Sequence, residues 1–351
     1  MGGDHAPASV VAGVDRFAAA HPGARFQLHG QAAALAPLLA AHPRAAAVSA
    51  VVDCPDVITM DMKPAAAMRK RHSSMFSALA AVKDGSAQAA VSAGNTGALM
   101  AMALLQLRTL EGCHRPALAA QWPTMRGRSI VLDVGANADS DPEQLIDFAI
   151  MGEAFARAML GIGRPSVGLL NIGSEDQKGH DDIREAMRLL RQHGSALEMN
   201  VHGFVEGNDI SMGTTDVVVT DGFTGNVALK AAEGAAKLVG SFIREALKSG
   251  PFSMLGALIA SRGLNGLKDR MDPRKVNGGV FLGLNGLVVK AHGGSDAVGF
   301  DAALGVAHQL AASSYNDDVR ASLARLAAAR AAATSAPAAA PAASDAAGAA
   351  N

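Results

Sequence analysis

A pattern of buried strand, glycine-bearing turn and helix start recurs along the 351-residue chain. In its clearest copy, the β-branched run 217–220 predicts a strand and Gly222 and Gly225 predict a sharp turn. The apolar spacing from Asn226 onward predicts a helix of about six turns. Further copies lie at residues 89–100, 130–144, 167–180 and 287–296. Alternating strands and helices require right-handed crossovers, so the sequence predicts an α/β fold with a doubly wound, mostly parallel sheet whose turns all meet at its carboxyl edge.

Each turn is a candidate anion-binding site, because the first N–H groups of a helix lack intrahelical partners and carry partial positive charge. The same turn reverses the chain in any α/β protein, so one copy alone does not separate the two interpretations. Several turns that meet in one crevice favour a ligand site. The candidate phosphate-binding residues are Asp4, His5, Gly94, Asn95, Thr96, Gly97, Asp221, Gly222, Thr224, Gly225, Asn226 and Lys290.

Two loops carry the candidate catalytic side chains. Lys178 is the leading electrostatic candidate, since a cation after a buried strand can neutralise a bound phosphate, although loop lysines are also commonly solvated. His292 is a candidate proton donor to a leaving thiolate. Ser295 and Asp296 lie in the same loop and complete the candidate catalytic set.

Composition limits the classes of function. A hydrophobic fraction of 49% indicates a globular core. The chain has 31 basic and 32 acidic residues and only 4% aromatic residues, which argues against nucleic-acid binding. Cys54 and Cys113 lie far apart without zinc or disulfide spacing, so both are expected to be buried, and no metal site is predicted.

A basic cluster, Arg69, Lys70 and Arg71, precedes two serines that can cap a helix from Met75. The cluster is either a solvated turn or a docking site for an acidic partner or a substrate phosphate.

A projecting helical segment is expected at about residues 240–272. Its apolar tip precedes scattered cations, including Arg262, Lys268, Arg270, Arg274 and Lys275. Such a segment suits an anionic membrane surface, and a dimer interface is the alternative. The tip residues are Phe252, Met254, Leu255, Leu258 and Ile259. The chain is expected to form one α/β domain over residues 1–320, followed by an Ala/Pro-rich disordered tail at 321–351.

Seven ordered motifs make the chain resemble the bacterial phosphate acyltransferases of phospholipid synthesis over residues 1 to about 312. They are Met1-Gly-Gly-Asp-His-Ala-Pro, Ser73-Ser-Met, Ser92-Ala-Gly-Asn-Thr-Gly-Ala, Leu132-Asp-Val-Gly-Ala-Asn, Leu170-Asn-Ile-Gly, Asp221-Gly-Phe-Thr-Gly-Asn and Val276-Asn-Gly-Gly-Val-Phe-Leu-Gly-Leu-Asn-Gly.

The resemblance implies reversible transfer of a fatty acyl group from acyl carrier protein (ACP) to inorganic phosphate, which gives acyl phosphate for a membrane glycerol-3-phosphate acyltransferase. It also implies a membrane-associated homodimer in the cytoplasm, with a fold like that of phosphotransacetylase and the isocitrate and isopropylmalate dehydrogenases. Relatives carry a strand immediately before the Met-Gly-Gly-Asp motif. We therefore expect the natural chain to start upstream, which intact-mass measurement of the native protein would test.

The expected chemistry needs donors for phosphate, donors for a tetrahedral oxyanion and a dry acyl channel. Phosphate is already an anionic nucleophile and thiolate a tolerable leaving group, so neither a covalent cysteine nor a metal is required, and no cofactor is expected.

Three other functions remain open from the sequence. A metal-dependent dehydrogenase would need clustered carboxylates, for which Glu175, Asp176, Asp181 and Asp182 are the candidates. A non-catalytic membrane scaffold for the carrier and a short-chain phosphotransacetylase are the other two.

Overall fold

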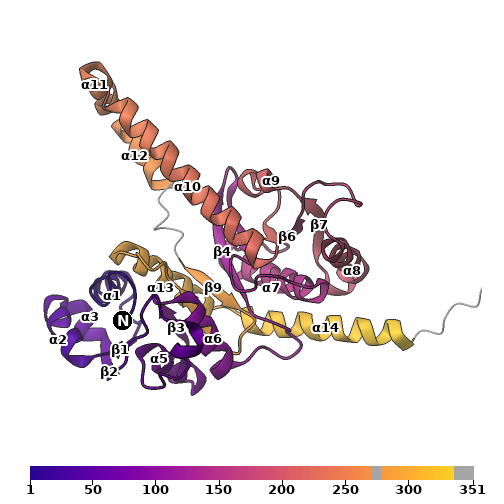
Figure 1. The fold of residues 1–351 in the computed structure, drawn as a ribbon, viewed down its shortest axis with the longest axis horizontal. Coiled ribbons are helices and arrows are strands. Elements are labelled where there is room, and N and C mark those ends of the chain that lie inside the picture. The colour runs from indigo at the N-terminus through magenta and orange to yellow at the C-terminus, as the bar shows by residue number, and fades with distance from the viewer. Residues whose placement is uncertain (271–277, 336–351) are drawn as a thin grey trace, which may run out of the picture.

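An eight-stranded sheet forms the centre of the computed structural model, which describes residues 1–270 and 278–335 (Figure 1). Its order is β3 (Ala89–Ser92), β10 (Leu287–Lys290), β9 (Gly279–Leu282), β4 (Ala117–Thr124), β5 (Gly127–Leu132), β8 (Val217–Val219), β6 (Ser166–Leu170) and β7 (Asn200–Val205). Side chains alternate between two cores: Val217 and Val219 enter one, and Val218 enters the other. Both faces of the sheet are therefore buried, as a doubly wound fold requires.

Helices cover both faces of this sheet. The first core packs beneath α1 (Ala8–Ala20), α7 (Pro142–Leu160), α8 (Asp181–Leu197), α13 (Ala297–Ala311) and α14 (Tyr315–Ser335). The second packs beneath α4 (Pro64–Ala67), α5 (Ser74–Lys83), α6 (Thr96–Leu107), α9 (Gly207–Met212) and the base of α10 (Gly222–Leu247). The predicted α/β class with a doubly wound sheet is thus confirmed.

The strands run in two directions, so the expectation of a single carboxyl edge is wrong. β3 is parallel to β10, and β5, β8, β6 and β7 are parallel to one another, but antiparallel pairs through β9 and β4 reverse the second group. The carboxyl ends of β10 and β5 nevertheless lie at one level of the sheet. Lys290, at the end of β10, lies opposite Gly279. The next residue, Val280, lies opposite Ala119, which in turn lies opposite Leu132 at the end of β5. The loops after β3 and β10 therefore run in the direction opposite to that of the loops after β5, β8, β6 and β7.

The predicted N-terminal caps are confirmed for two helices. Asp141 and Gln144 form the predicted capping box of α7, with proline at the first helical position. Ser73 caps α5 by accepting a hydrogen bond from the Phe76 N–H at 3.3 Å.

The start of α10 differs from the prediction. The helix begins at Gly222, four residues before Asn226, and the Asp221 carboxylate caps it by accepting from the Thr224 N–H at 2.7 Å. An aspartate at the N-cap position satisfies a free helix N–H, which outweighs the two glycines that suggested a turn. Residues 222–226 are therefore the first helical turn.

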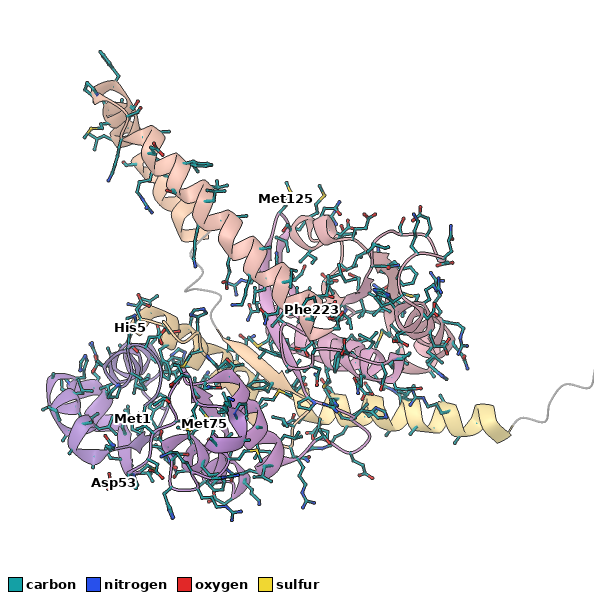
Figure 2. The ribbon with its side chains drawn as sticks, in the orientation of Figure 1. Met1, His5, Asp53, Met75, Met125 and Phe223 are labelled. Carbon is teal, nitrogen blue, oxygen red and sulfur yellow. The ribbon has the colours of Figure 1, made fainter. Side chains whose placement is uncertain are left out.

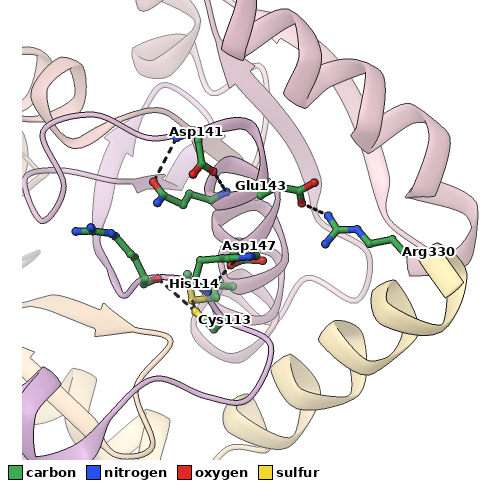
Figure 3. A network of polar contacts seen from close by, with 9 residues as sticks. Cys113, His114, Asp141, Glu143, Asp147 and Arg330 are labelled. Atoms are coloured by element: carbon green, nitrogen blue, oxygen red, sulfur yellow. Dashed lines mark hydrogen bonds and ion pairs between the residues drawn. The ribbon is translucent and has the colours of Figure 1, made fainter. Parts of the chain in front are cut away.

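The predicted disordered tail is wrong for residues 321–335, which continue helix α14. Leu323 and Leu326 are buried, and Arg330 pairs with Glu143 at the start of α7 (Figure 3). Spaced leucines supply the apolar contacts that the alanine-rich composition conceals. Residues 336–351 lie outside the described part of the chain.

A second, two-stranded parallel sheet, β1 (Phe26–Gly30) with β2 (Ser49–Asp53), is accompanied by α2 (Ala32–Ala41) and α3 (Pro43–Val48). A cavity of about 1030 Å³ separates β1 from β3 of the large sheet, and Leu28, Val91 and Phe300 help to line it. The strand expected upstream of Met1 stays a prediction.

Candidate functional site

Three loops that are distant in sequence meet beyond the ends of β3 and β10. We call residues 2–5, 92–97 and 290–295 the three-loop site. The Asp4 N–H donates to the Gly293 carbonyl at 3.0 Å, and the Ala291 N–H donates to the Ser92 carbonyl at 2.9 Å. A Cβ atom on Gly3 would lie 3.0 Å from the Ala93 Cβ atom, so the loops touch.

Helix α6 points its amino terminus into this site. Asn95 caps it by accepting from the Ala98 N–H at 3.0 Å, and its amide donates to the Met60 and Met62 carbonyls at 2.7 and 2.9 Å. The first intrahelical donor is the Leu99 N–H, so the N–H groups of Thr96 and Gly97 have no intrahelical acceptor. The cap is neutral, which leaves the positive end of the helix dipole uncompensated by the cap.

Lys290 adds a buried cation to the same site. Its side chain is 8% exposed, and its ammonium donates to the Ala291 carbonyl. Burial lowers the pKa of Lys290 to about 8, against the opposing effect of the nearby Asp4 charge. A desolvated cation beside free helix N–H groups is suited to an anion.

The other predicted residues of the three-loop site shape its turns. Ser295 is buried and its hydroxyl donates to the His292 carbonyl at 2.6 Å, while Asp296 caps α13 by accepting from the Gly299 N–H at 2.9 Å. His292 and His5 are exposed, and the His292 ring faces the Gly294 N–H at 3.3 Å. Of this group, His292 and His5 therefore present their imidazole rings to solvent at the site.

A second cluster lies where β5 and β8 end. We call residues 133–137 together with 221–226 the α10 turn. The Gly222 N–H donates to the Asn137 carbonyl at 2.7 Å, and a Cβ atom on Gly225 would lie 1.9 Å from the Asp133 carbonyl oxygen. Only glycine allows the helix to approach the loop this closely, which explains Gly222 and Gly225 better than a flexible turn does.

The α10 turn is rich in acceptors. The Asp221 carboxylate already takes the Thr224 N–H and hydroxyl, at 2.7 and 2.8 Å. Asp133 adds a second carboxylate, and burial raises its pKa despite the N–H groups that surround it. These carboxylates disfavour a bound phosphate at this helix end.

The two clusters are separate. Lys290 and Leu132 end neighbouring blocks of strands and are three strand spacings apart, or about 14 Å. Lys178 follows β6, five spacings or about 24 Å from β10. It is exposed and lies nearer to the α10 turn, so its predicted phosphate role is not supported by proximity to the three-loop site.

Sequence reasoning missed Asp133 and Asn137 as site residues, although it used their motif. Both are buried; Asp133 follows a predicted buried strand directly, and Asn137 comes four residues later in the same loop. A carboxylate in that place is the signal that identifies them, because a buried charge must be held by donors.

The remaining predicted side chains are the two cysteines, the basic cluster and the tip residues of the projecting segment. Cys54 and Cys113 are buried and free, as expected, and burial raises the pKa of Cys113 to about 12 (Figure 3). Lys70 pairs with Asp56 at 3.4 Å, whereas Arg69 and Arg71 are exposed in the turn after α4, which packs on α6 beside Gly97.

The tip residues are all exposed on a projecting arm. Helix α10 leads to α11 (Pro251–Ile259), and α12 (Ser261–Arg270) turns back along it (Figure 1). Phe252 is 89% exposed and Ile259 is 79% exposed, and Figure 2 shows the arm extending away from the rest of the ribbon. Within residues 1–270 and 278–335, none of the helices is both long and apolar enough to cross a membrane. Arg274 and Lys275 lie outside the described residues.

Carboxylates do not form a metal site in the described part of the chain. Asp176 pairs with Arg191 at 2.9 Å and Asp181 pairs with Arg184, and no three potential ligands cluster within the described residues.

Sequence comparisons place the chain among enzymes of fatty acid metabolism. The family described as "Fatty acid synthesis protein" matches residues 1–317. A phosphate acyltransferase from Caulobacter vibrioides is 56% identical over 329 residues, which cover 93% of this chain and 91% of that protein. A phosphate acyltransferase from Rhodospirillum centenum is 52% identical over 330 residues, which cover 94% of this chain and 92% of that protein.

Solved structures agree on the fold. A phosphotransacetylase from Streptococcus pyogenes has a TM-score of 0.55 at 16% identity and covers 86% of this chain and 91% of its own. The EutD phosphotransacetylase from Staphylococcus aureus has a TM-score of 0.50 at 14% identity and covers 87% and 99%. The predicted resemblance to the phosphotransacetylase fold is thus confirmed.

Proposed function

Because the chain belongs to the phosphate acyltransferase family of fatty acid synthesis proteins, we propose that it transfers a fatty acyl group from acyl-ACP to inorganic phosphate. A phosphate oxygen attacks the thioester carbonyl carbon, and the tetrahedral intermediate expels the carrier thiolate as the C–S bond breaks. The proton of hydrogen phosphate ends on that sulfur. The products are acyl phosphate and free ACP, and the reaction is reversible.

The three-loop site is the proposed phosphate site. The observation that carries this assignment is the buried Lys290, which lies opposite Ser92 at the end of β3, three residues before the neutral cap of α6. The N–H groups of Thr96 and Gly97 orient the anion, and Lys290 neutralises it. His292, at the exposed rim, is the candidate proton donor to the thiolate.

The α10 turn is the proposed binding surface for the arm of the carrier, which reaches from there to bring its thioester to the phosphate in the three-loop site. The side-chain amide of Asn226 suits the amide and hydroxyl groups of a carrier arm, and the Asp221 carboxylate repels free phosphate. Thr224 and Asn226 supply the polar contacts there. Lys178 lies on this side of the site, so its charge acts on the carrier side rather than on phosphate.

Surfaces around the site fit the partners expected from the family. Arg69 and Arg71, exposed beside the start of α6, are proposed to attract the acidic carrier. The α11 tip is proposed to hold the protein on an anionic membrane, near a glycerol-3-phosphate acyltransferase that consumes acyl phosphate. The exposed apolar side chains of α10, such as Leu238 and Phe242, suit a homodimer contact.

One assay tests the proposed reaction. Purified protein is mixed with long-chain acyl-ACP with and without phosphate, and acyl phosphate is trapped by hydroxylamine. Phosphate-dependent release of acyl hydroxamate and free ACP is expected. Carrier binding without acyl phosphate would support the scaffold function, and activity limited to short-chain acyl groups would support a phosphotransacetylase.

A further inference from the structure

Asp133 has an unusual environment for a carboxylate. It follows β5, is fully buried, and accepts five hydrogen bonds. One carboxylate oxygen takes the N–H groups of Leu118, Gly135 and Ala136, at 3.0, 3.0 and 2.9 Å. The other takes the Asn137 N–H at 2.7 Å and its side-chain amide at 2.9 Å. The carboxylate therefore fixes the whole loop 133–137 from inside.

That loop fits closely against the first turn of α10. A Cβ atom on Gly222 would lie 2.3 Å from the Asn137 carbonyl oxygen and 2.9 Å from the Asp133 carboxylate. Gly135, at a φ of 134°, leaves no room for a side chain beside Asn226, whose amide nitrogen lies 2.9 Å from the corresponding Cβ position. Gly222 and Gly225 are the buried residues of α10, so this loop is the main contact that orients the helix start.

We infer that Asp133 is a positioning residue for acyl transfer, holding the first turn of α10 so that Thr224 and Asn226 face the carrier arm of acyl-ACP. This inference rests on the proposed function. Asp133 itself is buried and acts through the loop and the helix. A carboxylate suits the position because all five neighbouring groups are donors, and an amide in its place would turn an N–H group toward at least one of them.

The test compares Asp133→Asn with Asp216→Asn. Asp216 is the matched control, because its carboxylate also fixes backbone, accepting from the N–H and hydroxyl of Ser166 at the start of β6 at 2.8 and 2.7 Å, but at the opposite end of β8 from α10. Both variants are assayed by steady-state kinetics with acyl-ACP and phosphate varied separately, and by hydrogen exchange of the amides in 222–228.

Asp133→Asn is expected to lower kcat/KM for acyl-ACP by at least about tenfold while the KM for phosphate changes by less than about twofold. Exchange in 222–228 is expected to quicken, and exchange at the start of α13 to stay unchanged. Asp216→Asn is expected to leave both measurements near wild type. Unchanged kinetics and exchange in Asp133→Asn, or equal changes for both substrates with faster exchange throughout, would overturn the inference.

A second variant covers a failure to fold. Asn137→Ala removes the side-chain amide bond to Asp133 but keeps the backbone contacts with α10, and it should give the same pattern at smaller size. Failure of the proposed function is seen separately: if the wild-type protein forms no acyl phosphate, the exchange measurement still decides whether Asp133 positions α10.

Discussion

The three-loop site and the α10 turn both pair a strand end with the amino terminus of a helix, yet their buried charges are opposite in sign. Asn95, a neutral side chain, caps α6, and Lys290 is buried at the end of β10, opposite Ser92. Asp221, a carboxylate, caps α10, and the buried Asp133 lies behind it. Equal backbone geometry therefore does not mean equal ligands: the cap and the nearest buried charge decide whether a helix end is open to an anion.

Removing the cation of the three-loop site should give the largest effect. Lys290→Met is expected to lower kcat/KM for phosphate by about 100-fold or more, because a preorganised charge contributes strongly in a desolvated site. The same variant should raise stability at pH 7, by up to about 3 kcal/mol, since the charged lysine is desolvated by burial. Phosphate-dependent hydroxamate formation and thermal unfolding check both results. Normal phosphate kinetics would remove Lys290 from the site.

A change in the α10 turn should affect the other substrate. Asn226→Leu keeps the volume of the side chain but removes its polar group, so kcat/KM for acyl-ACP is expected to fall about tenfold. The KM for phosphate should stay within about twofold of wild type, because phosphate binds elsewhere. Separate titration of the two substrates is the measurement. If the phosphate KM rises instead, the α10 turn and not the three-loop site holds the anion.

The pH dependence of kcat/KM for phosphate should report on Lys290 in the three-loop site. Lys290 loses its charge as the pH rises through about 8, so kcat/KM for phosphate should fall above that pH, by about tenfold near pH 9. Lys290→Arg should flatten this fall, since arginine stays charged. The lysine pKa is lower in the folded than in the unfolded chain, so the unfolded chain binds more protons between about pH 8 and 10.5. The free energy of unfolding contributed by Lys290 therefore rises with pH in that window, which denaturant titration can measure.

The sequence predicts the parts of the site better than their arrangement. Runs such as 217–219 and the glycine turns after them are local signals, and the α7 capping box is correct to the residue. The direction of the strands depends on the β4–β5 hairpin, whose first strand contains alanine, glutamine and Pro123 and lacks β-branched residues before Thr124. Without that hairpin, all turns are assigned to one edge, and Lys178 is placed together with Lys290, although the strands that precede them, β6 and β10, are five spacings or about 24 Å apart.

The limits of charge-based prediction are clearest at Asp221 and Lys290. In sequence, both are polar residues beside glycine turns, and both were assigned to phosphate binding. In the structure, Asp221 turns its carboxylate to its own helix, and Lys290 is buried at the end of β10. Whether the N–H groups at the start of a helix already have a side-chain acceptor depends on the direction of that side chain. Tertiary packing sets this direction, and the spacing of residues in the sequence does not.

The arm should show the smallest effect on catalysis, because it carries none of the reacting groups. Its apolar tip is exposed, and burying one large side chain fully in the acyl region contributes roughly 1.5–3 kcal/mol, so losing two anchors should release the protein from lipid. Leu255→Glu with Leu258→Glu also adds repulsion from an anionic surface.

The double variant is expected to stay in the supernatant with anionic liposomes, to elute at the wild-type volume in size-exclusion chromatography, and to keep turnover on dissolved acyl-ACP within about twofold. High salt should weaken wild-type binding only in part, since it screens the cations and not the apolar contacts. Continued sedimentation with lipid, or a shift to a smaller species, would assign the tip to a contact between two copies of the chain.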